Sequence, residues 1–296
     1  MDAIRTNNLT KYYGKSRGIR DISLVVEEGD FFGFIGPNGA GKSTTIRILL
    51  GLITATKGSA ELLGQELQRN KTAILKNVGY LPSEAMFYNG MRVKDILKLS
   101  ADLRKTDCSE EEKRLCNRLE LDINRKVDEL SLGNRKKVGI VCAMQHKPKL
   151  YILDEPTSGL DPLMQREFYS LLKERNEEGA TVFLSSHILS EVQRYCKHAA
   201  VVREGSLLIS DSVEYLGHTG AKRILLRGVE RAPELTHVRD VRTTQDTVSF
   251  LYSGNPDVLL KALSDLPITD ITIAEPDLEE VFMHYYTKEE NDNDNL

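Results

Sequence analysis

A glycine-rich segment, GPNGAGKST at residues 36–44, constrains the fold of this chain more than any other feature. It comes directly after the apolar run Phe31 to Ile35 and just before the apolar stretch Ile46 to Leu50. In the pattern G-x-x-x-x-G-K-[ST], the glycines let the backbone turn tightly and expose its N–H groups, and the helix that follows adds partial positive charge. The sequence therefore predicts a strand, a phosphate-binding loop and a helix in succession.

The predicted loop supplies two side chains besides its backbone. Lys42 carries a full positive charge, and the hydroxyl of Ser43 can reach a magnesium ion. The alternative is a glycine-rich turn that binds no ligand. We predict that nucleotide contacts come from every residue of the loop: Gly36, Pro37, Asn38, Gly39, Ala40, Gly41, Lys42, Ser43 and Thr44.

Length and composition exclude several classes of protein. With 296 residues the chain can form two unequal domains. It has no apolar run near the roughly 20 residues that cross a bilayer and no secretory signal, so we expect a cytoplasmic protein. A net charge of −4 lacks the basic excess of a general nucleic-acid binder, and we expect no nucleic-acid partner. The cysteine spacings fit neither zinc nor disulfides, which predicts free thiols at Cys108, Cys116, Cys142 and Cys196.

Three short, continuous apolar runs have the pattern of buried parallel strands separated by helices. They cover residues 31–35, 150–153 and 181–184. The first is followed by the glycine-rich loop, the second by Asp154 and Glu155, and the third by the sequence Ser-Ser-His ending at His187. Ligands of parallel sheets bind beyond the carboxyl ends of the strands, so we expect these three ends to form one site.

The remaining segments predict an accessory organisation around that sheet. Residues 84–146 are mostly helical in pattern, which indicates an inserted helical subdomain. After a first domain at 1–217, the strand and helix patterns of residues 218–287 predict a small C-terminal α/β module. The acidic, polar residues 288–296 are expected to be disordered.

Taken in order, these motifs resemble the ATP-binding subunit of an ABC transporter. The resemblance covers about residues 3–216 and rests on Tyr13, GPNGAGKST, VGYLP, LSLGN, YILDEP, SGLD and the histidine of SSH. It implies an α/β P-loop NTPase fold with a mixed sheet core, an antiparallel β subdomain and an inserted helical subdomain.

The resemblance also implies how phosphate and metal are held. Lys42 would bind the β- and γ-phosphates of ATP, and Ser43 and Asp154 would complete the shell of Mg²⁺. Alternatively, Asp154 could cap the next helix. After VGYLP the family has glutamine, which touches the metal and senses the membrane subunit, whereas this chain has Ser83 followed by Glu84. We expect Ser83 to reach the metal only through a water, or Glu84 to share the task.

The same resemblance assigns the catalytic residues and the adenine contact. Glu155 would orient and polarise the attacking water, and His187 would either donate to the γ-phosphate or hold Glu155 in place. Tyr13 would stack on adenine, unless Tyr12 does so or the ring only packs on the sheet.

Two further segments are implied to act across a dimer. In LSLGN, which departs from the family's LSGGQ at Leu132 and Asn134, Ser131 and Gly133 would contact the γ-phosphate held by the opposite subunit. The alternative is that Ser131 only caps its own helix. Asp161 would face the other subunit.

The function implied is ATP-driven transport. ATP would close a dimer, hydrolysis would open it, and a separate transmembrane permease would receive the motion at the inner face of the cell membrane. The C-terminal PDLEEVFMHYY resembles that of exporter-type subunits. Alternatives are a soluble ABC ATPase and a regulatory ABC subunit not coupled to transport.

Four residues could line a groove for a partner's short helix or belong to a core: Met86, Phe87, Tyr88 and Met91.

Overall fold

The computed structural model of the chain describes residues 1–274 except residues 15, 218–220, 245 and 265. It divides into two compact units, Met1–Asp211 and a second that begins at Ser212. The division precedes the boundary expected after residue 217, because α8 (Val213–Gly217) groups with the second unit. The expected disordered tail at 288–296 and the segment PDLEEVFMHYY lie outside the described residues.

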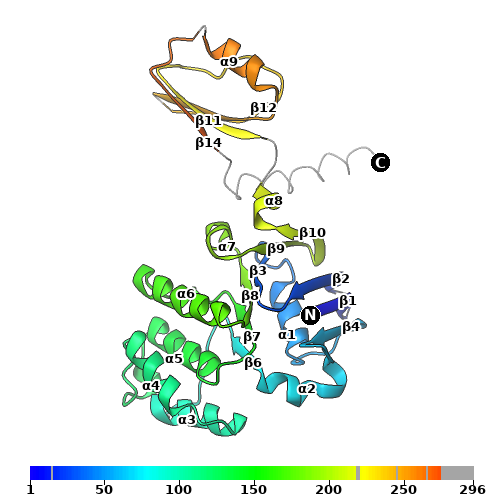
Figure 1. Cartoon of the computed structure of the whole chain (residues 1–296), viewed down its shortest axis with the longest axis vertical. Helices are drawn as coiled ribbons and strands as arrows, with labels where there is room; N and C mark the ends of the chain where they lie inside the picture. Colours follow the sequence, from blue (N-terminus) through cyan, green and yellow to red (C-terminus); the bar gives the residue numbers. More distant parts are fainter. Residues whose placement is uncertain (15, 218–220, 245, 265, 275–296) are drawn as a thin grey trace. The chain divides into compact units, whose positions relative to one another are not determined.

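The core of the first unit is a six-stranded sheet (Figure 1). Its order is β10 (Ser206–Ser212), β9 (His198–Arg203), β3 (Phe31–Ile35), β8 (Thr181–Ser186), β7 (Leu150–Asp154) and β6 (Val78–Leu81). The pairs β9–β3, β3–β8, β8–β7 and β7–β6 are parallel. Every residue of β3, β7 and β8 is buried, which confirms the interpretation of the three apolar runs as buried parallel strands.

A second, antiparallel sheet packs against this core. Its order is β2 (Ser16–Glu27), β1 (Asp2–Tyr13), β4 (Lys57–Leu62) and β5 (Gln65–Glu66). In β2 the apolar residues that alternate in the sequence, Ile22, Leu24 and Val26, are all buried. They share one hydrophobic cluster with Phe34 of β3 and Ile46 of the helix after it, so the two sheets enclose that helix between them.

The helices of the first unit fall into two groups. The first group comprises α1 (Lys42–Leu49), α2 (Leu67–Lys76), α6 (Pro162–Glu177) and α7 (Leu189–Tyr195). The second comprises α3 (Val93–Arg104), α4 (Ser109–Arg118), the 3₁₀ turn Val127–Glu129 and α5 (Leu132–Met144). Figure 1 shows α3, α4 and α5 gathered together beside α6. The segment expected to be helical therefore begins with non-helical chain, since its first helix starts at Val93.

The second unit contains a four-stranded antiparallel sheet. Its order is β12 (Val238–Thr243), β13 (Thr247–Tyr252), β11 (Lys222–Arg227) and β14 (Asp270–Ala274), and it is accompanied by α9 (Pro256–Ser264). Ile224, Phe250 and Leu259 belong to its hydrophobic core. The sequence patterns predict strands over 222–227 and 247–252, a helix from Val258 and a further strand from Ile271, but they give no signal for β12.

Two other expectations concern the described part of the chain. All four cysteines are free thiols, as predicted. None of the described helices combines the length and the apolar character that a bilayer crossing requires.

Candidate functional site

The three predicted strand ends meet at one edge of the central sheet. Ile35 pairs with Ser186, and Asp154 pairs with Ser185, so the last residues of β3, β8 and β7 lie side by side. The predicted convergence is confirmed. The residues that follow these strands form the candidate site.

The loop between β3 and α1 has the backbone that its glycines predict. Gly39 has φ of 83° and Gly41 has φ of 103°, values that side chains other than glycine rarely adopt. At Gly36 a Cβ atom would overlap the carbonyl oxygen of Val202. At Gly39, by contrast, a Cβ atom would meet nothing within 4 Å, so the loop faces open space there.

The amino end of α1 suits an anion. The capping residue Gly41 offers no side chain, and the first turn contains no acidic residue. The backbone N–H groups at the start of any helix have no partner within it, and here neither Ser43 nor Thr44 donates elsewhere among the described residues. Ala40 differs, because its N–H already donates to the carbonyl of Pro37 at 3.2 Å. The loop therefore presents unpaired donors and positive charge, which fits a nucleotide's phosphates.

Lys42 is buried at the centre of the site. Its Nζ donates to the carbonyl oxygens of Gly36 at 2.6 Å and Pro37 at 3.2 Å. The same Nζ lies 3.3 Å from Oε1 of Glu155. The carboxylate of Glu155 thus balances the charge of Lys42, where the resemblance places phosphates.

Glu155 is joined to the other catalytic candidate. His187 Nδ1 lies 2.7 Å from Glu155 Oε2, and the imidazole itself is about half-exposed. Of the two roles expected for His187, this geometry favours holding Glu155 in place. Glu155 Oε1 is buried and accepts no hydrogen bond, so its polar partner is the ammonium group of Lys42 at 3.3 Å.

Asp154 is a buried carboxylate at the end of β7. It accepts a hydrogen bond from the Ser185 hydroxyl at 2.7 Å, and it has no ion-pair partner among the described residues. Its carboxylate does not cap the next helix, because Asp161 occupies that position in α6. A buried carboxylate favours a nearby cation, and carboxylate and hydroxyl oxygens such as those of Asp154 and Ser43 are ligands that Mg²⁺ prefers.

Tyr13 and Ser83 lie at the ends of their strands. Tyr13 is 46% exposed, and its ring lies under Lys11 Nζ at 5.5 Å. Tyr12 is 42% exposed. Ser83 is exposed, and it is bound through its carbonyl oxygen rather than its hydroxyl, by Lys136 Nζ at 2.8 Å.

The residues expected to act across a dimer lie at the starts of two helices, α5 and α6. Ser131 caps α5, accepting from the N–H of Asn134 at 3.3 Å, while Gly133 lies in the first turn of that helix. Asp161 caps α6 by accepting from the N–H groups of Leu163 and Met164, both at 3.0 Å. Within the described chain, no hydrogen bond joins any of these three residues to the loop at 36–44.

Two residues of the site were not predicted from the sequence. Ser185 binds Asp154, and both its hydroxyl and its carbonyl accept from the N–H of Glu155, at 3.3 and 3.2 Å. Lys136 is buried in α5, and the desolvation of its ammonium group lowers its pKa to about 8 despite the carboxylates of Asp154 and Glu155 nearby. The helical period offered a signal, because position 136 lies in phase with buried Ile140 and Ala143.

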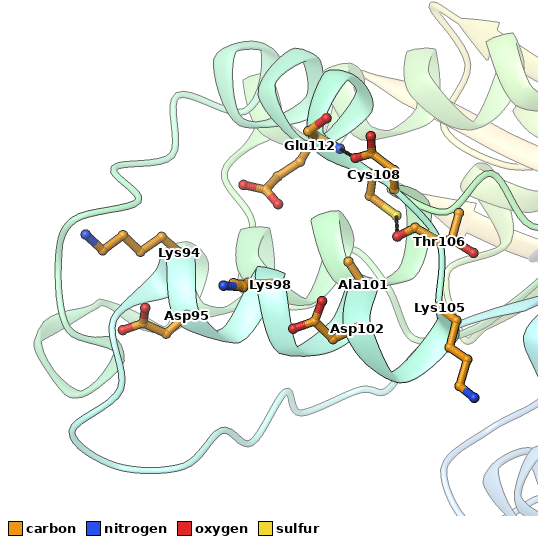
Figure 2. A pocket seen from close by; sticks show the side chains of 11 residues that line it. Lys94, Asp95, Lys98, Ala101, Asp102, Lys105, Thr106, Cys108 and Glu112 are labelled. Carbon is orange, nitrogen blue, oxygen red and sulfur yellow. Dashed lines mark hydrogen bonds between the residues drawn. The ribbon is translucent and has the colours of Figure 1, made fainter.

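A separate hollow of about 620 Å³ lies on the helical subdomain, and Figure 2 shows acidic and basic side chains around it. Its lining comes from α3, α4 and the segment between them, and it contains none of the predicted site residues. The candidate site is therefore the strand-end edge rather than this hollow.

Comparisons with known proteins agree with this geometry. The ABC transporter family model matches residues 19–158. The bacitracin transport ATP-binding protein BcrA of Bacillus licheniformis is 34% identical over 95% of this chain and 96% of its own length. A solved ATP-binding subunit of an ABC transporter superposes with a TM-score of 0.68 at 29% identity, over 72% of this chain and 91% of its own.

A further solved structure shares the fold. It is a dimeric ATP-binding cassette, MJ0796, bound to ADP and Pi, with a TM-score of 0.63 at 22% identity over 71% of this chain and 98% of its own. The motifs, the parallel strand ends and the full-length similarity together identify the family. This chain belongs to the ATP-binding proteins of ABC transporters, ATPases that power transport through a separate permease.

Proposed function

We propose that Glu155 is the catalytic base of this ATPase and that His187 holds it in place. The observation that carries the proposal is the position of the Glu155 carboxylate, with one oxygen 3.3 Å from Lys42 Nζ and the other 2.7 Å from His187 Nδ1. A base for hydrolysis must orient water beside the γ-phosphate, and Lys42 marks where that phosphate binds.

ATP binding changes the partner of Lys42. The γ-phosphate replaces Glu155 as the ion-pair partner of the Lys42 ammonium group. Glu155 keeps its contact with His187, and its carboxylate can then accept a proton from water. The N–H groups at the start of α1 bind the phosphates, and Tyr13 stacks on adenine. Asp154 and Ser43 would hold Mg²⁺, and Ser83 would reach it only through a water. When bound, this ion neutralises charge that develops on the phosphate oxygens.

Two copies of the chain form the complete site. Among the described residues, Ser131, Gly133 and Asp161 form no hydrogen bond with their own phosphate loop, and we propose that they complete the site of the opposite subunit. The helix start at Ser131 already caps itself, and its amino end can still attract the γ-phosphate of the other copy. Closure around ATP and opening after hydrolysis form a two-state switch.

The transport direction and the location are proposed from similarity. BcrA is named for bacitracin transport, and we propose that this chain drives export of a compound through its permease at the inner face of the cell membrane. Met86 and Tyr88 are 89% and 75% exposed, whereas Phe87 and Met91 are half-buried, so we propose that the first two side chains contact that permease. We also propose residues 1–217 as the ATP-binding domain and 218–287 as an accessory module, with residues 84–146 as the helical subdomain.

The test is the Glu155→Gln variant of the full-length chain. Because the amide cannot accept a proton, we expect ATP binding to persist, turnover to fall at least about 100-fold and a dimer to accumulate with ATP. Turnover would be measured as phosphate release and association by light scattering. Glu177→Gln, on an exposed position of α6, is the matched control. A Glu155→Gln variant that hydrolyses ATP at the wild-type rate would remove Glu155 from this role.

A further inference from the structure

Lys136 connects three parts of the site through one ammonium group. Its Nζ donates to the carbonyl oxygens of Pro82 at 3.0 Å, Ser83 at 2.8 Å and Glu155 at 3.1 Å. An ammonium group has three donors, and all three are used. Lys136 itself lies in α5, one turn after Ser131, so this single group joins the α5 helix to the loop after β6 and to the residue after β7.

The burial of this lysine is costly unless the charge has a use. Lys136 is 2% exposed, and among the described residues it has no carboxylate within ion-pair distance. A helix can bury an apolar side chain at this position with no desolvation penalty, as it does at Val138 and Ile140. Packing alone therefore does not account for a lysine at position 136.

The backbone of Glu155 shows what the lysine stabilises. Glu155 has φ of 48°, in the left-handed region that is unfavourable for a residue with a side chain. Such a conformation persists only when its surroundings fix it. Its N–H donates to the carbonyl of Ser185 at 3.2 Å, and its carbonyl accepts from Lys136 and from the N–H of Ser158 at 3.3 Å. The residue is thus held on both of its peptide groups.

The same ammonium group ties this backbone to the segment at Pro82 and Ser83. That segment immediately follows β6, and two of the three bonds of Lys136 go to it. A displacement of the segment, or of α5, would strain the bonds of Lys136 and so act on the carbonyl of Glu155.

We propose that Lys136 is a positioning residue, which holds Glu155 in its left-handed conformation and couples the position of Glu155 to the segment at Pro82 and Ser83. This inference rests on the proposed role of Glu155 as the base. Lys136 contacts neither phosphate nor water in the reaction, so it acts on turnover through Glu155 rather than on nucleotide binding.

The experiment replaces Lys136 with methionine, which has a similar length and no donors, in the full-length chain. We expect kcat of ATP hydrolysis to fall at least about 10-fold, while the Kd for ATP, measured by equilibrium titration, stays within about 3-fold. The matched control is Lys137→Met. Lys137 is the neighbouring lysine and has no hydrogen bond or ion pair among the described residues, so this variant should keep the wild-type kcat and Kd for ATP. Lys136→Gln retains an amide donor and should give an intermediate kcat.

The outcomes separate this inference from the base assignment. In a Glu155→Gln background, Lys136→Met should lower the residual turnover by less than about 2-fold, because the group through which it acts is already gone. The inference is overturned if Lys136→Met keeps kcat within about 2-fold of wild type, or if the affinity for ATP falls in step with kcat. Should Lys136→Met not fold by circular dichroism, Lys136→Gln decides by the same criteria. Wild-type turnover in Glu155→Gln alone would instead remove the base assignment.

Discussion

The phosphate loop and the surroundings of Glu155 meet at one edge of the sheet, but they are built in different ways. The loop is a single segment, 36–44, whose glycine conformations and unpaired N–H groups are properties of that segment itself. Glu155 is held by Lys136 from α5, Ser185 from β8 and His187 after it.

This difference predicts that the two regions respond differently to change in the sequence. A binding surface made of backbone donors is specified by one short contiguous motif. Its formation therefore depends on that motif alone. A side chain positioned by residues from several elements depends on the packing of all of them. We therefore expect substitutions in the loop to affect nucleotide affinity, and substitutions around Glu155 to affect turnover.

The largest effect that tests this comparison is expected from Lys42→Ala. Removal of the only full positive charge in the loop eliminates charge-assisted bonds to two phosphates, and we expect the Kd for ATP to rise about 100-fold, about 3 kcal/mol. Equilibrium titration with ATP would measure it, and Lys76→Ala, an exposed lysine of α2, is the control. Unchanged ATP affinity in Lys42→Ala would contradict the loop assignment.

A second test concerns the anchoring of α5, which carries Lys136. Just after this helix, the ring of His146 contacts the carbonyl of Val78 through Nε2 at 3.2 Å. Burial of the imidazole, with a smaller contribution from Arg104, lowers the His146 pKa to about 4, whereas an unfolded histidine titrates near about 6.5. Between these values the unfolded chain binds more protons than the folded chain, so stability falls as the pH falls.

From about pH 7.5 to about pH 5, we expect this one group to cost about 2 kcal/mol of unfolding free energy. Urea unfolding at both pH values would measure the loss of unfolding free energy. In a His146→Gln variant this loss should be smaller than in wild type, by the contribution of His146. Equal losses in the two proteins would show that His146 is not held neutral. The anchoring of α5 would then depend on other contacts, such as that of Gln145 with the carbonyl of Leu97.

Much of the fold was predictable because its signals are local. The buried strands β3, β7 and β8 are continuous apolar runs, and the order of their ends followed from the rule for parallel sheets. Strand β12 was missed because its sequence, VRDVRT, is almost wholly exposed and shows no apolar alternation. The chain divides before α8 rather than after residue 217, and α8 has no composition signal that separates it from the preceding strand.

The site was predictable to a lesser degree. The loop, Asp154, Glu155 and His187 could be placed at one edge of the sheet because each begins within three residues of the end of a predicted strand. Lys136 was missed because it stands in the run Arg-Lys-Lys, where only the helical phase distinguishes the buried lysine from exposed Arg135 and half-buried Lys137. For Ser131 the sequence left open a cap or a contact with the other subunit, and the cap is present, while the contact needs a second copy of the chain.

The smallest effect that we expect tests whether the assembled part of the site is separable from the loop. In Ser185→Ala the hydrogen bond to Asp154 is lost, but the bond from the N–H of Glu155 to the backbone carbonyl remains. We expect kcat to fall about 10-fold, about 1.4 kcal/mol, with the Kd for ATP within about 3-fold. Steady-state kinetics and equilibrium titration would measure the two values.

The matched control for this variant is Ser186→Ala, since the Ser186 hydroxyl bonds to Ile188 and Glu191 instead of Asp154. If Ser185→Ala loses ATP affinity as strongly as turnover, Asp154 contributes to nucleotide binding through Ser185, and the division between a local loop and an assembled catalytic part fails. If turnover alone falls, the side chains at the ends of β7 and β8 set the rate, while the loop after β3 sets the affinity.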